Sequence, residues 1–430
     1  MIGLLSVFAA HRWGRFRDRA AITAHQDRLL ARFRKKVMPR SALYAGMTDR
    51  ALADLPLMDR DGAMRDFDLI STAGLTRAEA EAMAHAAEPG AGTSAPAPRP
   101  DGLAAGFSTG TSGRRGLFVT DAAERRIWAA AVAGRFWPRP MLRPQRIALF
   151  LRADNRLYSA LNAGPLRLRF FDAALPPEAH LPALSALRPT VIAGPPSVLL
   201  AVAAALDAAG AERLRPSVTL CGAEPAEPQD LEALATAFGP RPDIIYQCTE
   251  GVLAMTCRHD NLHLNERHVA FRREIIDADT GAFVPVISDL IRHSQPVLNY
   301  RLDDVLVPDP DPAPCPCGCA SARIARIEGR LGDAVFLPAT DGGRRWISSE
   351  ALRRAALSVP GAQDWALRQN GPARLDFHLA GALPGDARAR LQDACATIAR
   401  KAGACPPEVG LTAGLPPPDG IKRRRIRILV

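Results

Sequence analysis

The chain has 430 residues, of which 47% are hydrophobic, 23% are charged and only 6% are aromatic. This composition is typical of globular proteins and excludes a coiled coil, a collagen-like fibre and a disordered chain. At about 100–200 residues per domain, the length predicts two or three domains, each able to bury its own core without disulfides.

The charge is basic, with 55 Lys and Arg against 45 Asp and Glu, which gives a formal net charge of +10. Such a balance could indicate a nucleic-acid or anionic-membrane partner. Lys occurs only at positions 35, 36, 401 and 422, however, so nearly all of the positive charge is Arg spread along the chain. Charge of that kind is typical of a solvated surface, and we therefore expect no nucleic-acid partner.

The first ten residues, MIGLLSVFAA, are apolar but reach only about half the length that a membrane span needs. We expect a short helix or a buried strand there in preference to a membrane anchor, and no later stretch reaches span length. Between residues 11 and 40, Ile22, Leu29 and Phe33 recur at helical spacing in a basic segment. This pattern, which includes Leu30, predicts an amphipathic helical arm packed on the body.

Residues 88–100 are almost all Pro, Gly, Ala, Ser and Thr, which predicts a loop. From residue 189, short apolar runs alternate with helical segments, which predicts βαβ units and a parallel sheet. The predicted strands are 191–194, 218–222 and 243–247, and the predicted helices are 196–209 and 229–238. Gly194, Gly222 and residues 248–251 then fall at the carboxyl ends of strands, where ligands bind in open α/β sheets.

Short alternating runs and a turn at 277–281 predict antiparallel β structure between residues 256 and 307. The remaining hundred residues predict a compact α+β unit, with helices at 350–357 and 386–402 and a strand at 374–379. We therefore predict an α/β fold with a large N-terminal domain, residues 1–330, of mostly parallel sheets and helices. A small α+β lid domain follows, residues 331–430.

A glycine- and hydroxyl-rich segment, FSTGTSGRRG, lies at 107–116. Small residues let backbone N–H groups approach closely, and the hydroxyls can donate hydrogen bonds, so the segment suits a phosphate chain. A plain surface loop is the alternative. The segment lacks the GK[ST] ending of a Walker loop.

Two acidic motifs follow. In YQCTEG at 246–251 a strand ends in Glu250, whose carboxylate could hold Mg²⁺, although a solvated turn carboxylate is the alternative. In NYRLDDV at 299–305, Asp304 could accept the hydroxyls of a ribose, and Arg330 of RIEGRLGD could bind phosphate or sugar. These two charges could instead form a salt-bridged turn.

Near the chain's end, DGIKRRRIRI at 419–428 is a basic run that could be a nucleic-acid or targeting patch. It nevertheless places Lys422 in a chain that otherwise almost always uses Arg, and the two cations are not interchangeable at a reacting centre. Eight Cys include three in CPCGC at 315–319. Because the chain starts without the pattern of an export signal, this crowding favours a metal site and a cytoplasmic location over disulfides.

In their order, these motifs resemble those of the acyl- and aryl-adenylate-forming superfamily, and within it the phenylacetate-CoA ligase-like branch, from about Phe107 to Lys422. The resemblance implies catalytic roles for Lys422, Glu250 and Thr249. It also implies a nucleotide site formed by the phosphate loop, the GAEP segment, the Tyr-x-x-[Ser/Thr]-Glu strand end, the ribose-binding Asp and the GR motif. The residues at these positions are Ser108, Thr109, Gly110, Thr111, Ser112, Gly113, Gly222, Ala223, Glu224, Tyr246, Asp304 and Arg330.

The chain departs from the family at two of these motifs. Arg114 stands where the phosphate loop usually has Lys, and Gly332 stands at the hinge position after the GR motif. Gly absorbs large dihedral changes, so a rotating lid remains compatible with the sequence. The N-terminal third matches the family poorly, and the acid pocket is therefore not assigned, beyond Tyr158, Ala223 and Tyr246 as candidate walls.

A metal site accompanies the resemblance to this branch. Cys315 and Cys317 resemble the CPCG turn of these ligases, and Cys257 with His263 resembles a Cys…Leu-His pair just after their YxxxE strand. Three thiolates and one imidazole are the ligands of a closed structural zinc site, within a β region at about 255–320. Cys319 or His259 could replace one of these ligands, and reduced buried Cys is the alternative.

The resemblance implies ATP-dependent activation of a carboxylic acid, aryl in this branch, to an acyl-adenylate with release of pyrophosphate. Mg²⁺ would assist, and the acyl group would then pass to coenzyme A. Transfer to a carrier-protein thiol and adenylylation of a cofactor are alternatives within the enzyme class. A zinc-containing nucleic-acid-binding protein and a non-catalytic binding protein are alternatives outside it. A homodimer is possible.

Overall fold

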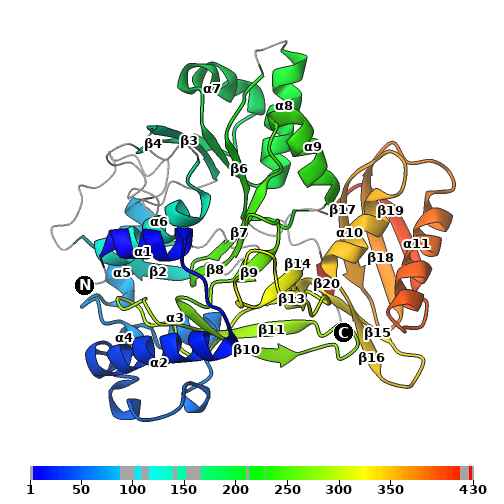
Figure 1. Cartoon of the computed structure of the whole chain (residues 1–430). Helices are drawn as coiled ribbons and strands as arrows, with labels where there is room; N and C mark the ends of the chain where they lie inside the picture. Colours follow the sequence, from blue (N-terminus) through cyan, green and yellow to red (C-terminus); the bar gives the residue numbers. More distant parts are fainter. Residues whose placement is uncertain are drawn as a thin grey trace.

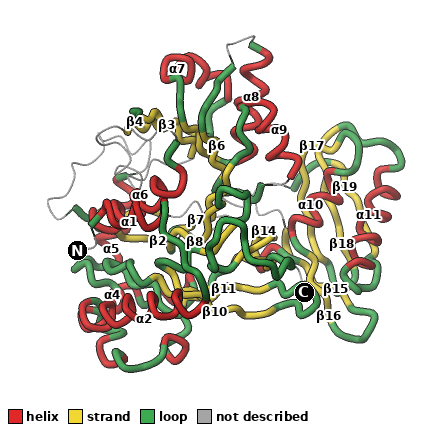
Figure 2. The backbone as a smooth tube through the Cα atoms, in the orientation of Figure 1, coloured by secondary structure: helices red, strands yellow, loops and turns green. Residues whose placement is uncertain are grey.

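The computed structural model describes residues 3–87, 102–107, 116–138, 143–151, 166–209, 213–226, 228–416 and 426–428. Within these ranges the chain forms a twelve-stranded sheet with helices on both faces of its parallel half, and a smaller α+β unit follows residue 330 (Figure 1). Figure 2 shows the same arrangement by secondary structure, with the helices grouped around the sheet's strands.

Helices and short 3-10 turns make up the first 87 residues. Asp18 caps the long second helix, because its carboxylate accepts a hydrogen bond of 2.7 Å from the Ala21 N–H. Ile22, Leu29 and Phe33 of that helix are buried, as the amphipathic pattern predicts, and the first apolar residues form a short helix. The elements are α1 (Leu4–Arg12), α2 (Arg19–Lys36), η1 (Met38–Arg40), η2 (Ala45–Met47), η3 (Leu52–Asp54), α3 (Arg60–Arg65), α4 (Phe67–Ile70) and α5 (Arg77–Ala86).

A hairpin and a capped helix lead into the sheet. Strands β1 (Ala104–Phe107) and β2 (Leu117–Thr120) pair antiparallel, and α6 (Ala122–Phe136) follows. Asp121 and Glu124 form a capping box at the start of α6, each side chain accepting a backbone N–H of the other.

The parallel half of the sheet has the strand order β4-β3-β5-β6-β7. Because side chains alternate along β3, Phe150 joins a core with α7, α8 and α9, whereas Leu149 faces the opposite side, toward α6. The strands are β3 (Gln145–Leu151), β4 (Leu166–Asp172), β5 (Val191–Gly194), β6 (Val218–Cys221) and β7 (Asp243–Cys248). The helices are η5 (Pro177–His180), α7 (Leu181–Leu187), α8 (Pro196–Ala208) and α9 (Pro228–Phe238).

Beyond β7 the sheet continues antiparallel in the order β8-β9-β14-β13-β11-β10, as the alternating pattern after residue 256 predicts. Strand β12 (Tyr300–Arg301) pairs with β11 and forms a parallel bridge with Met58, which ties the N-terminal segment to this half. The strands are β8 (Gly251–Thr256), β9 (Leu262–Leu264), β10 (Val269–Ile275), β11 (Phe283–Asp289), β13 (Asp304–Pro308) and β14 (Arg323–Arg330).

The unit after Arg330 has its own core, in which Phe377, Leu391 and Trp365 are buried. A single 3-10 turn, η6 (Leu331–Asp333), connects it to β14. It has a four-stranded sheet, β19-β18-β17-β20, a hairpin and two helices. Its elements are β15 (Val335–Pro338), β16 (Arg344–Ile347), α10 (Ser349–Leu357), β17 (Ala362–Gln369), β18 (Arg374–Gly381), α11 (Ala387–Lys401), β19 (Glu408–Ala413) and β20 (Ile426–Ile428).

The α/β class with a small α+β unit at the C-terminal end is thus confirmed. The predicted strands and helices between residues 191 and 247 are present within one or two residues of their expected bounds. The loop expected at 88–100 lies outside the described residues. None of the described helices combines the length and the apolar character that crossing a bilayer requires.

We predict that Gly194→Ala lowers the free energy of unfolding by about 1–3 kcal/mol. A Cβ at the end of β5 would lie 2.8 Å from the Phe150 Cβ, and both strands are held by the parallel sheet. Urea denaturation measures the effect. The matched control is Gly46→Ala, where an added Cβ meets nothing within 4 Å. Equal stability of the two variants would contradict the prediction.

Candidate functional site

The carboxyl end of β7 meets the antiparallel half of the sheet at three predicted site residues. The Tyr246 hydroxyl donates a hydrogen bond of 2.6 Å to Asp304 at the start of β13. Asp304 is paired in register with Arg330 of β14, whose Nε lies 3.8 Å from its carboxylate. Burial raises the pKa of Asp304, although Tyr246 and Arg330 oppose this. Tyr246, Asp304 and Arg330 therefore form one polar cluster. In it Asp304, the residue predicted to bind the ribose, is also ion-paired with Arg330.

Glu250 lies just beyond the end of β7 with both carboxylate oxygens hydrogen-bonded. The Tyr300 hydroxyl donates to Oε1 at 3.0 Å and the Thr249 hydroxyl to Oε2 at 2.9 Å. Burial favours the neutral acid, but the Arg60 guanidinium and hydrogen bonds to Glu250 hold the pKa of its carboxyl below the ordinary value. Glu250 is therefore an anion at neutral pH.

A loop after β11 supports the Thr249 end of this cluster. Arg292, which is only 1% exposed, donates a hydrogen bond to the Thr249 carbonyl. The next residue, His293, donates to the Asp121 carboxylate at 2.7 Å. The hydrogen bond from His293 to Asp121 raises the pKa of the imidazole to about 9, so His293 is a cation at neutral pH. Glu124 accepts from the Ser294 N–H and hydroxyl, at 2.8 and 2.7 Å, which fixes the same loop on α6.

An apolar cavity of about 150 Å³ lies between α6 and the parallel strands. Gly194, Gly222 and Ala223, at the carboxyl ends of β5 and β6, form one wall, and Trp128 and Phe136 of α6 form another. Ala223 has a left-handed backbone, φ +65°, which a residue with a Cβ rarely adopts and which often marks a functional turn. The Glu224 carboxylate, in contrast, is exposed and accepts a hydrogen bond of 2.7 Å from the Ser197 hydroxyl.

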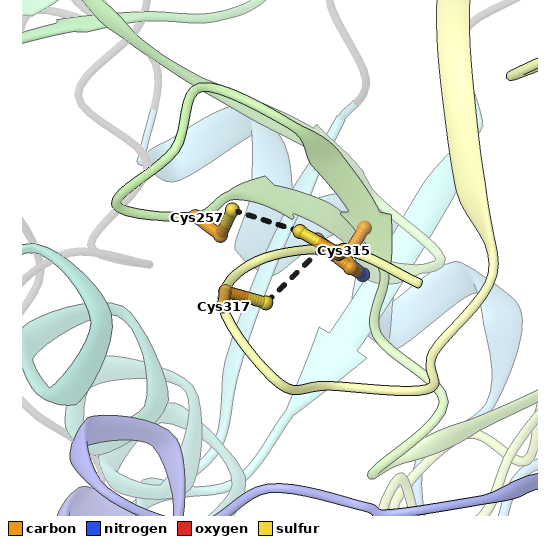
Figure 3. A group of neighbouring side chains, drawn as sticks. Cys257, Cys315 and Cys317 are labelled. Carbon is orange, nitrogen blue, oxygen red and sulfur yellow. Dashed lines mark hydrogen bonds between the residues drawn. The ribbon is translucent and has the colours of Figure 1, made fainter. Parts of the chain in front are cut away.

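The four predicted metal ligands converge in the β region. The Cys257, Cys315 and Cys317 sulfurs and one His263 nitrogen all lie within 4.8 Å of one another, and all four residues are buried. Figure 3 shows the three thiols turned toward a common point between two loops. The Sγ atoms of Cys257 and Cys315 are 3.7 Å apart, close to the edge of about 3.8 Å that a tetrahedron with Zn–S bonds of about 2.3 Å requires.

His263 has the geometry of a ligand in this group. Its Nδ1 contacts the Ser321 carbonyl at 2.8 Å, and its Nε2 lies 3.5 Å from the Cys317 sulfur. The pKa of His263 is lowered to about 4, chiefly by burial, so the ring is neutral and its Nε2 lone pair is available. The alternatives Cys319 and His259 are not part of the group of four, since the Cys319 sulfur contacts Ser321 instead, at 3.4 Å.

The remaining predicted residues lie outside the described part of the chain. These are the phosphate loop with Arg114, Tyr158 and Lys422. Among the candidate walls of the acid pocket, Ala223 lines the apolar cavity, whereas Tyr246 directs its hydroxyl to Asp304.

Sequence reasoning missed Arg60, Tyr300 and Arg292. Tyr300 lies inside the NYRLDDV motif, four residues before Asp304, and this position of a hydroxyl-bearing ring is a signal that could have identified it. Arg60 and Arg292 are two of 55 basic residues and carry no local signal.

No protein-family model matches the chain, and no curated protein matches its sequence. The chain nevertheless has the fold of the acyl- and aryl-adenylate-forming ligases, as the resemblance implied.

Three solved structures show this likeness. The structure of 2-hydroxyisobutyryl-CoA ligase in its postadenylation state, in complex with 2-HIB-AMP, is 17% identical, with a TM-score of 0.65 over 96% of this chain and 90% of that chain. An open conformation of the same ligase with 2-HIB-AMP and CoA is 18% identical, with a TM-score of 0.60 over 95% and 90%. The anthranilate CoA ligase AuaEII with anthranoyl-AMP is 14% identical, with a TM-score of 0.53 over 78% and 68%.

We predict that His293→Gln destabilises the protein in a pH-dependent manner. Because the folded-state pKa of about 9 exceeds the unfolded value near 6.5, the contribution of His293 is fully present below about pH 6.5 and is lost as the pH rises through about 9. The wild type should exceed the variant by about 2 kcal/mol at pH 6, a value discounted for the 30% exposure of the side chain. Chemical denaturation at pH 6 and pH 9.5 checks this, and an equal difference at both pH values would contradict it.

Proposed function

We propose that this protein is an adenylate-forming ligase that activates a carboxylic acid with ATP and releases pyrophosphate. The observation that supports this most strongly is the polar cluster at the end of β7. Strands distant in sequence bring Tyr246, Thr249, Glu250, Asp304 and Arg330 to one sheet edge, in a fold that matches acyl-AMP-bound ligases over most of the chain. That edge is where ligands bind in open α/β sheets.

In the proposed reaction, a carboxylate oxygen attacks the α-phosphorus of ATP. The bond between the α-phosphorus and the bridging oxygen breaks, pyrophosphate leaves with the electron pair, and an acyl-adenylate forms. Asp304 would accept the ribose hydroxyls and Arg330 would bind phosphate or sugar. Lys422 would bridge the carboxylate and the α-phosphate, and residues 108–113 would grip the β- and γ-phosphates. The chain's work is alignment and charge stabilisation.

Glu250 fits the role of a Mg²⁺ ligand in its charge state. Its carboxylate is ionised, and two hydroxyl donors leave further lone pairs on the oxygens for a cation. Bound Mg²⁺ would neutralise negative charge on the phosphates. Tyr300 and Thr249 would keep the carboxylate in a fixed orientation at the strand end.

The apolar cavity is the proposed site for the acid's side chain. It opens beside Gly222 and Ala223, which belong to the GAEP segment, and its α6 wall is formed by Trp128, Val132 and Phe136. Burying hydrocarbon there yields about 25 cal/mol per Å², whereas a charged group would lose hydration, and Arg125 of the lining already donates to the Thr120 and Gly102 carbonyls. We therefore expect an acid with an uncharged, apolar body, of which an aryl acid is one form.

The acceptor in the second half-reaction is proposed to be coenzyme A, because 2-hydroxyisobutyryl-CoA ligase in its open conformation is in complex with both the acyl-adenylate and CoA. The unit after Arg330 would move about η6, which contains Gly332. A carrier-protein thiol remains the alternative acceptor, and the phenylacetate-CoA ligase-like branch rests on the CPCG and Cys…Leu-His motifs.

The group of Cys257, His263, Cys315 and Cys317 is the proposed structural zinc site. All four ligand positions are buried and mutually close, which is typical of a closed tetrahedral site. The metal would join the turn after β8 to the 315–319 loop. It would take no part in the phosphate chemistry, since no ligand position is left for water.

The main prediction concerns pyrophosphate release with a panel of aryl, alkyl and charged acids. We expect release with apolar acids and a mass-spectrometric signal for the matching acyl-AMP. Lys422→Ala should reduce the rate by about 10²–10³-fold, because a charge partner of the reacting groups is lost. Lys401→Ala is the matched control, since Lys401 is exposed at the end of α11.

The nucleic-acid-binding alternative would be favoured if no acid supports pyrophosphate release and if the protein binds DNA with a salt-sensitive affinity that Lys422→Ala weakens. Release that is unchanged in Lys422→Ala would contradict the catalytic role of that residue.

A second prediction concerns the metal. Purified protein should hold about one zinc per chain by elemental analysis, and Cys317→Ser should lose it. The free energy of unfolding of the variant should be lower than that of the wild type by at least about 3 kcal/mol. This is a fraction of the roughly 10–16 kcal/mol that structural zinc supplies in peptides. Cys405→Ser, outside the group of four, should keep both zinc and stability. Zinc-free wild-type protein of equal stability would contradict the proposal.

A further inference from the structure

A second, smaller cavity lies beside Glu250, between the N-terminal segment and the end of β7. Its volume is about 30 Å³, and its walls include Arg60, Gly116, Glu250, Arg292 and Tyr300. Two arginines from distant parts of the sequence thus line the same cavity as Glu250, and the charge of Arg60 acts on its carboxylate. Nothing in the sequence motifs assigned either arginine to the site.

Arg292 is a buried cation whose hydrogen-bond acceptors are all neutral among the described residues. It donates to the Thr249 and Val119 carbonyls and to the Gln295 side-chain oxygen, and its Nε has no described partner. Asp289 interacts with it electrostatically, but burial raises the pKa of that carboxyl to about 7, so it is only partly ionised. A cation at 1% exposure that is compensated, within the described residues, only by the Trp128 ring and a partly ionised carboxylate is costly, and an anion beside it would lower the cost.

Arg60 is placed at the cavity by strand-like pairing of the N-terminal segment. Met58 exchanges backbone hydrogen bonds with Asn299 and Arg301, at 3.0 and 2.7 Å, and Asp59 caps the helix that Arg60 begins. The Arg60 Nε is buried without a described partner, and its Nη2 is 3.8 Å from Asp303. The guanidinium therefore keeps unused donors at the cavity.

The charges around the cavity leave room for a further anion. Asp304 is paired with Arg330, and the Glu250 oxygens already accept two hydroxyl groups. Of the charged residues that line the cavity, Arg60 and Arg292 are cations and Glu250 is the anion, whereas Asp303, which is also near Arg60, lies outside the lining and is half exposed. Arginine donors arranged in forks match phosphate oxygens well. The cavity exceeds the 10–15 Å³ that one water needs, so it can admit oxygens of a phosphate group.

We propose that Arg60 and Arg292 form an anion subsite that binds the terminal phosphate oxygens of the nucleotide, and of the pyrophosphate that leaves. This inference rests on the proposed function for the identity of the ligand. It assigns a substrate-binding role to a residue that precedes Phe107, where the resemblance to the family begins. Arg60 is the residue to test, because Arg292 also holds the backbone at Thr249.

The test is calorimetric binding of inorganic pyrophosphate in EDTA, without any acid substrate. Removing charge-assisted hydrogen bonds should weaken binding by about tenfold or more in Arg60→Gln. Arg65→Gln is the matched control on the same helix, since Arg65 is 70% exposed and pairs only with Asp66 among the described residues. Its affinity should equal that of the wild type. Equal affinity of Arg60→Gln and wild type would overturn the proposal.

A double-mutant cycle separates direct binding from neutralisation of Glu250. If Arg60 contacts the anion, Arg60→Gln weakens pyrophosphate binding in the Glu250→Gln background as well. If Arg60 serves only Glu250, the substitution has no effect there, and the subsite is disproved. Should Arg60→Gln fail to fold, Arg60→Lys takes its place, with an expected loss of at least about threefold, and wild-type affinity of that variant overturns the proposal.

Failure of the anion subsite and failure of the proposed ligase activity give different results. Pyrophosphate binding needs no acid, so a chain that activates none of the acids can still show the Arg60 dependence. Conversely, if acyl-AMP forms and Arg60→Gln has an unchanged affinity for pyrophosphate, the ligase activity is supported and the anion subsite is disproved.

Discussion

The hydrogen bond from the Tyr246 hydroxyl to Asp304 joins the two halves of this protein at the place where its chemistry is proposed. Tyr246 lies near the carboxyl end of the last parallel strand, whereas Asp304 begins a strand of the antiparallel half. Strand β7 is common to both halves, parallel to β6 and antiparallel to β8. The site therefore depends on a sheet that changes direction at β7, because this junction brings polar groups from both halves together.

Charge compensation organises the surroundings of that junction. Glu250 remains ionised because Arg60 and the hydrogen bonds from Cys248, Thr249 and Tyr300 outweigh its burial. Arg292 and His293 are adjacent cations. Among the described residues His293 is ion-paired with the ionised Asp121, whereas the carboxylate near Arg292 is Asp289, whose pKa is raised to about 7 by burial. Buried charges are expensive unless they are paired, and the contrast between these two neighbours is what distinguishes a structural cation from one available to a ligand.

Much of the parallel half could be predicted from local pattern. Apolar runs such as VIAG and VTLC, each followed by a helix of ten or more residues, permit few arrangements other than βαβ units. Part of the metal group was also accessible, because the crowded Cys of CPCGC favour a metal site, whereas Cys257 and His263 were implied by the family resemblance. Arg60 was not accessible. Its place depends on a bridge between Met58 and Tyr300, more than two hundred residues apart, and pairing at that range leaves no periodic trace in the sequence.

The sequence by itself determined the order of the chemical groups along the chain and the class of fold that could present them. These are local properties: strand and helix periodicity, the hydroxyl-rich segment, the acidic strand ends and the Cys and His spacing. Each depends on residues close together in the chain and can therefore be recognised from the sequence. Only the tertiary structure decided which charges face one another, which carboxylate is neutralised and by which arginine, and where the cavities lie. Those outcomes depend on burial and on long-range strand pairing, whose energies arise only when distant segments exclude water together.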